Sequence, residues 1–221
     1  MSSREAILGR IRAALTDVPR GETPEDVPVP RNYRRSHVEP GGDCVALFAE
    51  RVADYRATVT RTDRAGLPAA IAAALTARGV RQLALPGGFP VELLPPGDWE
   101  WHPEPLDVPQ LDALDGVITL AAAGIAVTGT IVLDAGPGQG RRALTLVPDY
   151  HLCIVRAEQI ADDVPDALTR LDPTRPLTFI SGPSATSDIE LNRVEGVHGP
   201  RTLDVVIVDA SADPTHPEQH P

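Results

Sequence analysis

Lysine is absent from this chain of 221 residues, and all 20 of its basic residues are arginine. A pyridoxal Schiff base, a lysine-dependent aldolase and a Walker-A phosphate loop each need an amine at a defined place, so the sequence excludes these three classes. Acidic residues number 31, which gives a formal net charge of −11 and a pI near 4.9. Because nucleic acids and anionic membranes are bound by basic faces, we expect neither as a partner.

Cysteine is also scarce, with only Cys44 and Cys153, far apart in the sequence. Two thiols cannot hold an iron–sulfur cluster by four cysteines or a cysteine-rich zinc site, and no spacing of His, Asp or Glu is typical of a metal site. We therefore expect no metal and no cofactor in this chain. It has no long apolar run and no secretory signal pattern, which predicts a reduced, cytoplasmic protein without a membrane span.

The start of the chain predicts a short helix followed by an extended arm. Apolar side chains recur there at helical spacing behind a serine that can cap the helix: Ile7, Leu8, Ile11 and Leu15. The residues from 17 to about 42 are rich in proline and charge and have no apolar period. We assign residues 1–42 to a helix and arm that dock on a partner or a second subunit, 43–210 to one α/β domain, and 211–221 to a disordered tail.

The central part alternates helices and strands, which favours an α/β fold with a mixed sheet flanked by helices. The spacing predicts helices over residues 44–56, 67–78 and 162–171. It predicts strands over residues 81–86, 177–180 and 203–209, and paired strands within 116–136 and 143–160. The segment GPGQGRR, residues 136–142, matches neither a dinucleotide fingerprint nor a P-loop, so we interpret it as the hairpin loop joining the paired strands.

Three segments of the C-terminal half resemble the signatures of the LUD-domain family, and within it the lactate utilization protein C group. They are ITLAAAGIAVTGTIVL (118–133), LTLVPDYHLCIVRAEQI (144–160) and ISGPSATSDIELNRVEGVHGPRTLDVVIV (180–208). The resemblance implies the NagB/RpiA/CoA-transferase-like fold, which ribose-phosphate isomerase, CoA transferases and formyltetrahydrofolate cyclo-ligase share. It also implies a non-catalytic or accessory subunit of a complex that oxidises L-lactate to pyruvate, with the iron–sulfur clusters carried by partner subunits.

A second hypothesis follows from the fold relatives alone. The chain could be a stand-alone enzyme or binding protein for a phosphate-, CoA- or formyl-type anion, although a shared fold does not establish a shared function. Neighbouring genes that encode cysteine-rich iron–sulfur proteins would favour the first hypothesis over this one.

Small polar residues follow the strand predicted at 177–180 and have two interpretations. Where a strand passes through a loop into a helix, free N–H groups and the positive helix end suit an anion; the candidates are Gly182, Ser184, Thr186, Asp188 and Glu190. The alternative is a turn followed by a capping box, with Ser187 as the cap and Glu190 three residues later. We favour the box for Ser187 and Glu190, and anion binding for Ser184 and Thr186.

The segment VTGT offers further candidates, Thr128, Gly129 and Thr130. A glycine inside a strand weakens it unless another backbone or a ligand approaches closely, and a bulge or sheet bend is an equal alternative. An acidic residue often precedes this motif in the family, whereas Val127 stands here, which weakens a catalytic interpretation.

Two arginines and one histidine complete the candidate site. Arg141 and Arg142 could close over an anion, because a guanidinium fork matches a carboxylate. His198 lies between two glycines in a predicted loop, where it could face a cleft and move protons. His151 also matches the family pattern, but its place within a strand favours a core side chain.

Overall fold

The computed structural model describes residues 2–19, 21, 23, 26, 29–30, 32–34, 36–38, 41–183, 185–186, 194–195 and 199–209. The chain forms two compact units, residues 1–34 and 35–221. The first contains α1 (Ser3–Ala14), which confirms the predicted N-terminal helix. The Ser2 hydroxyl accepts from the backbone N–H of Glu5, and the Glu5 carboxylate accepts from that of Ser2, so a capping box begins the helix.

No residue of α1 is buried. Its apolar stripe is exposed, with 57% of Ile7, 48% of Ile11 and 56% of Leu15 accessible to solvent. The described residues contain no helix that is long and apolar enough to cross a membrane.

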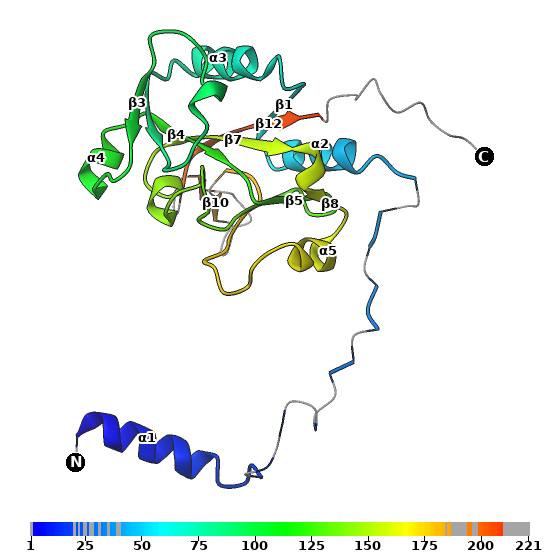
Figure 1. The fold of residues 1–221 in the computed structure, drawn as a ribbon, viewed down its shortest axis with the longest axis vertical. Coiled ribbons are helices and arrows are strands. Elements are labelled where there is room, and N and C mark those ends of the chain that lie inside the picture. Colours follow the sequence, from blue (N-terminus) through cyan, green and yellow to red (C-terminus); the bar gives the residue numbers. More distant parts are fainter. Residues whose placement is uncertain are drawn as a thin grey trace. The chain divides into compact units, whose positions relative to one another are not determined.

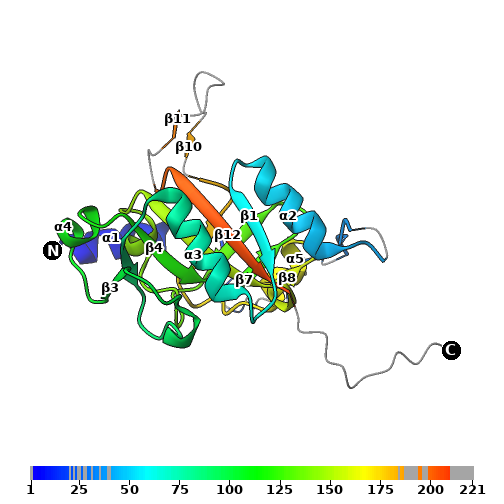
Figure 2. The same cartoon turned by 90° about the horizontal axis from the view of Figure 1, so that it is seen from above.

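The second unit is built on a six-stranded sheet in which every neighbouring pair is parallel (Figure 2). Its strands, in spatial order, are β1 (Thr58–Thr62), β12 (Thr202–Val208), β7 (Tyr150–Arg156), β4 (Gly116–Leu120), β2 (Gln82–Leu85) and β3 (Glu100–Pro103). The carboxyl ends of all six strands therefore meet at one edge, which is where open α/β sheets bind ligands.

Alternating side chains of the central strands are buried on opposite faces of this sheet. On one face Val206 packs with Ile71 of α3 (Leu67–Arg78) in one apolar cluster. On the other face Val205 packs with Phe48 of α2 (Cys44–Asp54). Both helices were predicted, and α3 has the predicted bounds. Gly79 ends α3 in the left-handed conformation, as expected of a C-terminal cap.

A second, four-stranded sheet lies beyond the α2 face. Its strands, in spatial order, are β8 (Ile160–Ala161), β5 (Ala123–Ile125), β6 (Thr130–Leu133) and β9 (Thr178–Ile180). β5 runs parallel to β8 and antiparallel to β6, which runs antiparallel to β9. The helix α5 (Val164–Thr169) covers its outer face and lies just below β5 and β8 in Figure 1.

The single mixed sheet predicted from the sequence is thus two sheets, one parallel and one mixed. The division follows from two consecutive amides: Ala121 N–H donates to the carbonyl of Ile154 in the large sheet, and Ala122 N–H donates to that of Val132 in the small one. The continuous apolar run at 116–133 hid this change of sheet.

The predicted hairpin at residues 136–142 is wrong. This loop leaves β6 of the small sheet and leads through a 3₁₀ turn, η3 (Arg142–Thr145), to β7 of the large sheet. It is held by the ends of two parallel strands, because Gly138 N–H donates to Gly87 and the Gly138 carbonyl accepts from Leu120. Residues 143–145, which were predicted to begin a strand, therefore belong to η3 instead.

The remaining elements are short and connect the strands at the ends of the large sheet. They are η2 (Val91–Leu93), α4 (Val108–Asp112), η4 (Ala157–Gln159), and the two-stranded ladder of β10 (Ala185–Thr186) and β11 (Val194–Glu195). The described end of the proline-rich arm belongs to the second unit. There the His37 ring nitrogen contacts the carboxylate of Asp163, the N-cap of α5, and the Ser36 hydroxyl lies 3.3 Å from Asp162 Oδ2.

Because α1 buries no side chain, deletion of residues 2–34 should leave the melting temperature within about 2 °C of the full-length value. A loss of about 1 kcal/mol in the free energy of unfolding would lower it by about 2–4 °C. Thermal melts of the two proteins measure this. Phe48→Ala is the matched positive control and should lower the free energy of unfolding by about 3–5 kcal/mol, because Phe48 of α2 is fully buried. A truncation that melts as early as Phe48→Ala would contradict the assignment of α1 to a separate unit.

Candidate functional site

Two of the predicted hydroxyl groups, those of Thr128 and Thr130, meet in the structure together with that of Ser181. The Oγ1 atoms of Thr128 and Thr130 lie 2.7 Å apart, and Thr130 Oγ1 lies 2.8 Å from the Oγ of Ser181. Residues 126–129 form a turn between β5 and β6, closed by Gly129 N–H and the carbonyl of Ala126. The TGT segment is therefore a turn and the start of a strand, whereas the sequence had suggested a strand interior.

The end of helix α2 approaches both glycines of this region. Gly129 has a φ of +56°, and a Cβ added to it would lie 2.6 Å from the backbone carbonyl carbon of Arg51. Gly182 has a φ of +83°, and its Cβ would lie 2.6 Å from the Cβ of Tyr55. The close approach predicted at Gly129 is thus made by another part of the backbone.

The strand before the polar cluster, β9, is partly exposed. β9 is an edge strand of the small sheet, and Phe179 at its centre is 50% exposed. Thr186 lies in the short ladder strand β10. The other candidates of the cluster, Ser184, Ser187, Asp188, Glu190 and His198, lie outside the described residues. Their role as an anion site or a cap stays a prediction.

Arg141 and Arg142 lie elsewhere. The Nε of Arg141 is 3.6 Å from the Glu104 carboxylate, and the same guanidinium donates to the carbonyl of Leu106. Arg142 donates to the Thr178 hydroxyl at 3.0 Å, at the opposite end of β9 from Ser181. The structure therefore does not bring these two arginines to the hydroxyl groups of Thr128, Thr130 and Ser181.

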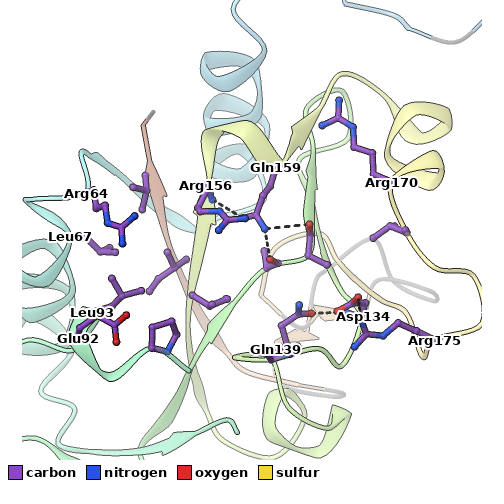
Figure 3. Close-up of a pocket in the computed structure, with 18 residues that line it drawn as sticks. Arg64, Leu67, Glu92, Leu93, Asp134, Gln139, Arg156, Gln159, Arg170 and Arg175 are labelled. Atoms are coloured by element: carbon purple, nitrogen blue, oxygen red, sulfur yellow. Dashed lines mark hydrogen bonds and ion pairs between the residues drawn. The ribbon is translucent and has the colours of Figure 1, made fainter. Parts of the chain in front are cut away.

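A cavity that the sequence did not reveal lies at the carboxyl edge of the large sheet and has a volume of about 430 Å³ (Figure 3). Its floor is apolar and consists of side chains where α3 begins and where β4, β7 and β12 end: Leu67, Leu120, Ile154 and Val208. Polar groups are placed around this floor, the usual construction of a small-molecule site. Arginines stand at or just beyond the ends of two strands, Arg156 in β7 and Arg64 after β1, but β1 was not among the predicted strands.

Two glutamines hold the walls of the cavity. The side-chain amide of Gln159 donates to the carbonyls of Ala121 and Ala122, at 2.9 and 3.5 Å, and its oxygen accepts from Arg156 N–H at 3.0 Å. Gln139 is 6% exposed, and its oxygen accepts from the backbone N–H of Asp134 at 2.6 Å. These bonds fix the backbone where the chain passes between the sheets.

The lining carries more positive than negative charge. Four guanidinium groups face two carboxylates, a formal net charge of +2 in an acidic chain: Arg64, Arg156, Arg170 and Arg175 against Glu92 and Asp134. In Figure 3, Arg64 and Glu92 lie on one side, Asp134 and Arg175 on the other, and Arg156 between them. The cavity is thus suited to an anion.

Among the described residues that line the cavity there is no histidine, cysteine, serine or threonine. The groups in the lining that could take part in acid–base chemistry are the carboxylates of Glu92 and Asp134. In the same described part of the chain, no group of three or more His, Cys, Asp or Glu side chains could hold a metal ion.

The histidine of the second signature is a core residue, as the sequence favoured. His151 is 1% exposed, and its Nε2 lies 2.8 Å from the hydroxyl oxygen of Thr119. That hydroxyl donates to the Cys153 sulfur at 3.6 Å. Burial lowers the pKa of His151 to about 4, because a charged imidazole would be removed from water. At neutral pH this side chain is uncharged.

Comparison with known proteins agrees with the signatures. The model of the LUD domain matches residues 109–208, and lactate utilization protein C of Deinococcus radiodurans is 43% identical over 196 residues, which are 85% of this chain and 89% of that protein. The chain belongs to the LUD-domain family. It is a homologue of lactate utilization protein C.

More distant relatives share less of the chain. Lactate utilization protein C of Halalkalibacterium halodurans is 33% identical over 110 residues, 46% of this chain and 47% of that protein. A crystal structure of a DUF162 family protein from Deinococcus radiodurans is 39% identical and superimposes with a TM-score of 0.64, covering 75% of this chain and 96% of that one.

The packing of Gly129 against α2 predicts a specific loss on substitution. Gly129→Ala should lower the free energy of unfolding by about 3 kcal/mol, because about 1–2 kcal/mol of left-handed strain adds to the cost of overpacking, about 1–3 kcal/mol. The control is Gly79→Ala, at φ +67° with nothing within 4 Å of the added Cβ, which should cost the strain alone. Equal losses in urea denaturation would contradict a role for Gly129 in seating α2.

The buried imidazole of His151 predicts a pH dependence of stability. The unfolded chain takes up a proton near the ordinary pKa of 6.5, but the folded protein does so only near 4. The free energy of unfolding should therefore fall as pH falls from 6.5 to 4, by up to about 1.4 kcal/mol per pH unit. In urea titrations, His151→Asn should flatten this slope, whereas His102→Asn, whose histidine side chain is 36% exposed, should keep it. An unchanged slope in His151→Asn would contradict the assignment.

Proposed function

We propose that this protein is an accessory subunit of a complex that oxidises L-lactate to pyruvate through iron–sulfur partner subunits. The observation that carries the proposal is the 43% identity to a lactate utilization protein C over 85% of the chain. The large parallel sheet with its flanking helices also suits the NagB/RpiA/CoA-transferase-like fold that we propose for the second unit.

The state of the two cysteines supports a division of labour between subunits. Burial is the main cause that raises the pKa of both Cys44 and Cys153 to about 12, whereas the thiolate is the form that ligates metals. Cys153 is fully buried in the core, and Cys44 is partly buried at the start of α2. Iron–sulfur clusters would then be held by partner subunits.

The exposed stripe of α1 offers a surface for such partners. Its residues Ile7, Ile11 and Leu15 are each about half exposed, and an amphipathic helix of this kind binds by laying its apolar face into a groove. We propose that α1 docks on the iron–sulfur subunits.

A second candidate function rests on the cavity. A site at the carboxyl edge of a parallel sheet, lined by four arginines, also suits a stand-alone enzyme or binding protein for a phosphate-, CoA- or formyl-type anion. In either case the predicted polar cluster at residues 182–198 stays a proposed anion-binding element.

The test is purification of tagged protein from its native host, followed by identification of retained proteins and an assay of L-lactate oxidation with an artificial electron acceptor. We expect cysteine-rich iron–sulfur proteins to be retained and the eluted complex to oxidise lactate. The chain purified alone should be colourless and inactive. Deletion of residues 2–34 should abolish retention.

Turnover of L-lactate by the isolated chain would contradict an accessory role. Full-length protein that retains no iron–sulfur partner at native abundance would favour the stand-alone alternative.

A further inference from the structure

We propose that the cavity at the carboxyl edge of the large sheet binds an organic anion larger than lactate. Its carboxylate or phosphate head group is held between Arg64 and Arg156, and its apolar body lies on the floor of the cavity. This inference rests on the cavity alone and does not depend on a role in lactate oxidation.

The strand order places the two arginines around one point. Arg64 follows β1 by two residues, and Arg156 is the last residue of β7. Both strands pair with β12, which runs between them. Strands two positions apart are separated by about 10 Å, and arginine side chains reach far enough from both sides to meet over the end of β12 at Val208.

The other lining cations are engaged with carboxylates of the protein. Arg175 lies 2.8 Å from Asp134, whose side chain is 13% exposed. Arg170 lies 2.6 Å from Asp166, and these side chains are 43% and 38% exposed. The pair of Arg156 with Glu158, at 2.9 Å, is the most exposed of the three, with 59% and 58% of the side chains accessible, and the mutual attraction within such a surface pair is weak. Arg64 has no ion pair or hydrogen bond within the described part of the chain. An incoming anion is therefore attracted most strongly to Arg64 and Arg156.

Side chains must provide the recognition, because the backbone amides beside the floor are already used. The N–H groups of Leu120, Ala121 and Ala122 donate to Gly138, Ile154 and Val132 at 2.8–3.0 Å. Guanidinium forks match both carboxylate and phosphate oxygens and bind them through charge-assisted hydrogen bonds. The head group is thus defined as a planar or tetrahedral oxyanion.

The size and floor of the cavity define the rest of the ligand. A volume of about 430 Å³ is in the range of sites for complete metabolites, and an anion as small as lactate would leave most of it empty. Leu93 and Leu120 are among the apolar side chains that line the cavity, and Leu93 lies beside Glu92 on the Arg64 side (Figure 3). An apolar body that covers them removes both surfaces from water, which strengthens binding.

The test is calorimetric titration of the full chain with four probes that separate head group from body: acetate, hexanoate, inorganic phosphate and hexyl phosphate. We expect hexanoate to bind at least tenfold more tightly than acetate, or hexyl phosphate at least tenfold more tightly than inorganic phosphate, because each buried CH₂ improves affinity about fourfold. Whether the carboxylate probes or the phosphate probes bind identifies the head group that the cavity recognises.

Three variants locate the binding. Arg64→Gln should weaken the better probe at least tenfold, since a charge-assisted hydrogen bond is lost. Glu92→Gln should leave affinity unchanged or increase it, because it removes a like charge from the wall. Arg201→Gln, an exposed arginine paired with Asp149 outside the cavity, should change nothing, and melting temperatures confirm that each variant is folded.

Four outcomes would overturn the proposal. They are no binding of any probe at millimolar concentration, equal affinity for short and long probes, unchanged binding by folded Arg64→Gln, and weaker binding by Glu92→Gln. The last of these would show that the site recognises a cationic group. All four are independent of whether the protein retains iron–sulfur partners.

Discussion

Two consecutive amides determine the architecture of this protein. Ala121 N–H bonds to the large parallel sheet and Ala122 N–H to the small mixed sheet, so a single peptide step carries the chain from one layer to the other. The side-chain amide of Gln159 donates hydrogen bonds to both carbonyls of that step. Because buried backbone groups need partners, this pairing allows a change of sheet within the core. α2 packs against Ala121 on one side of this step, and Ala121 and Ala122 line the cavity.

Local signals predicted the parts of the fold that depend on nearby residues. α2 and α3 were visible from their apolar spacing, and Gly79 marked the end of α3. The division into two sheets could not be predicted, because buried strands of both sheets are continuous apolar runs and only partners distant in sequence distinguish them. The loop at 136–142 was mistaken for a hairpin for the same reason: Gly138 bonds to Gly87 and Leu120, which are not its neighbours in sequence.

The candidate site illustrates the same limit. Gly129 was correctly singled out as a position of close approach, but α2 is what approaches it, and the end of α2 also approaches Gly182, which was predicted as part of an anion site. The arginine-lined cavity escaped notice because the strand before Arg64 was not predicted, and without it Arg64 has no defined place. Knowledge of the strand order alone would have brought Arg64 and Arg156 to the same edge.

The position of β12 has a consequence for folding. β1 pairs with β12, beginning with Thr58 opposite Asp204. The first strand of the large sheet in the sequence therefore cannot pair until the last one, β12, is available. Pairings of such long sequence separation form slowly, and chains emerging from the ribosome leave their first elements without final partners. The two arginines that flank β12 come together only when it inserts, so the cavity is completed in the closing step of folding, and a nascent chain lacking its C-terminal strand cannot form it.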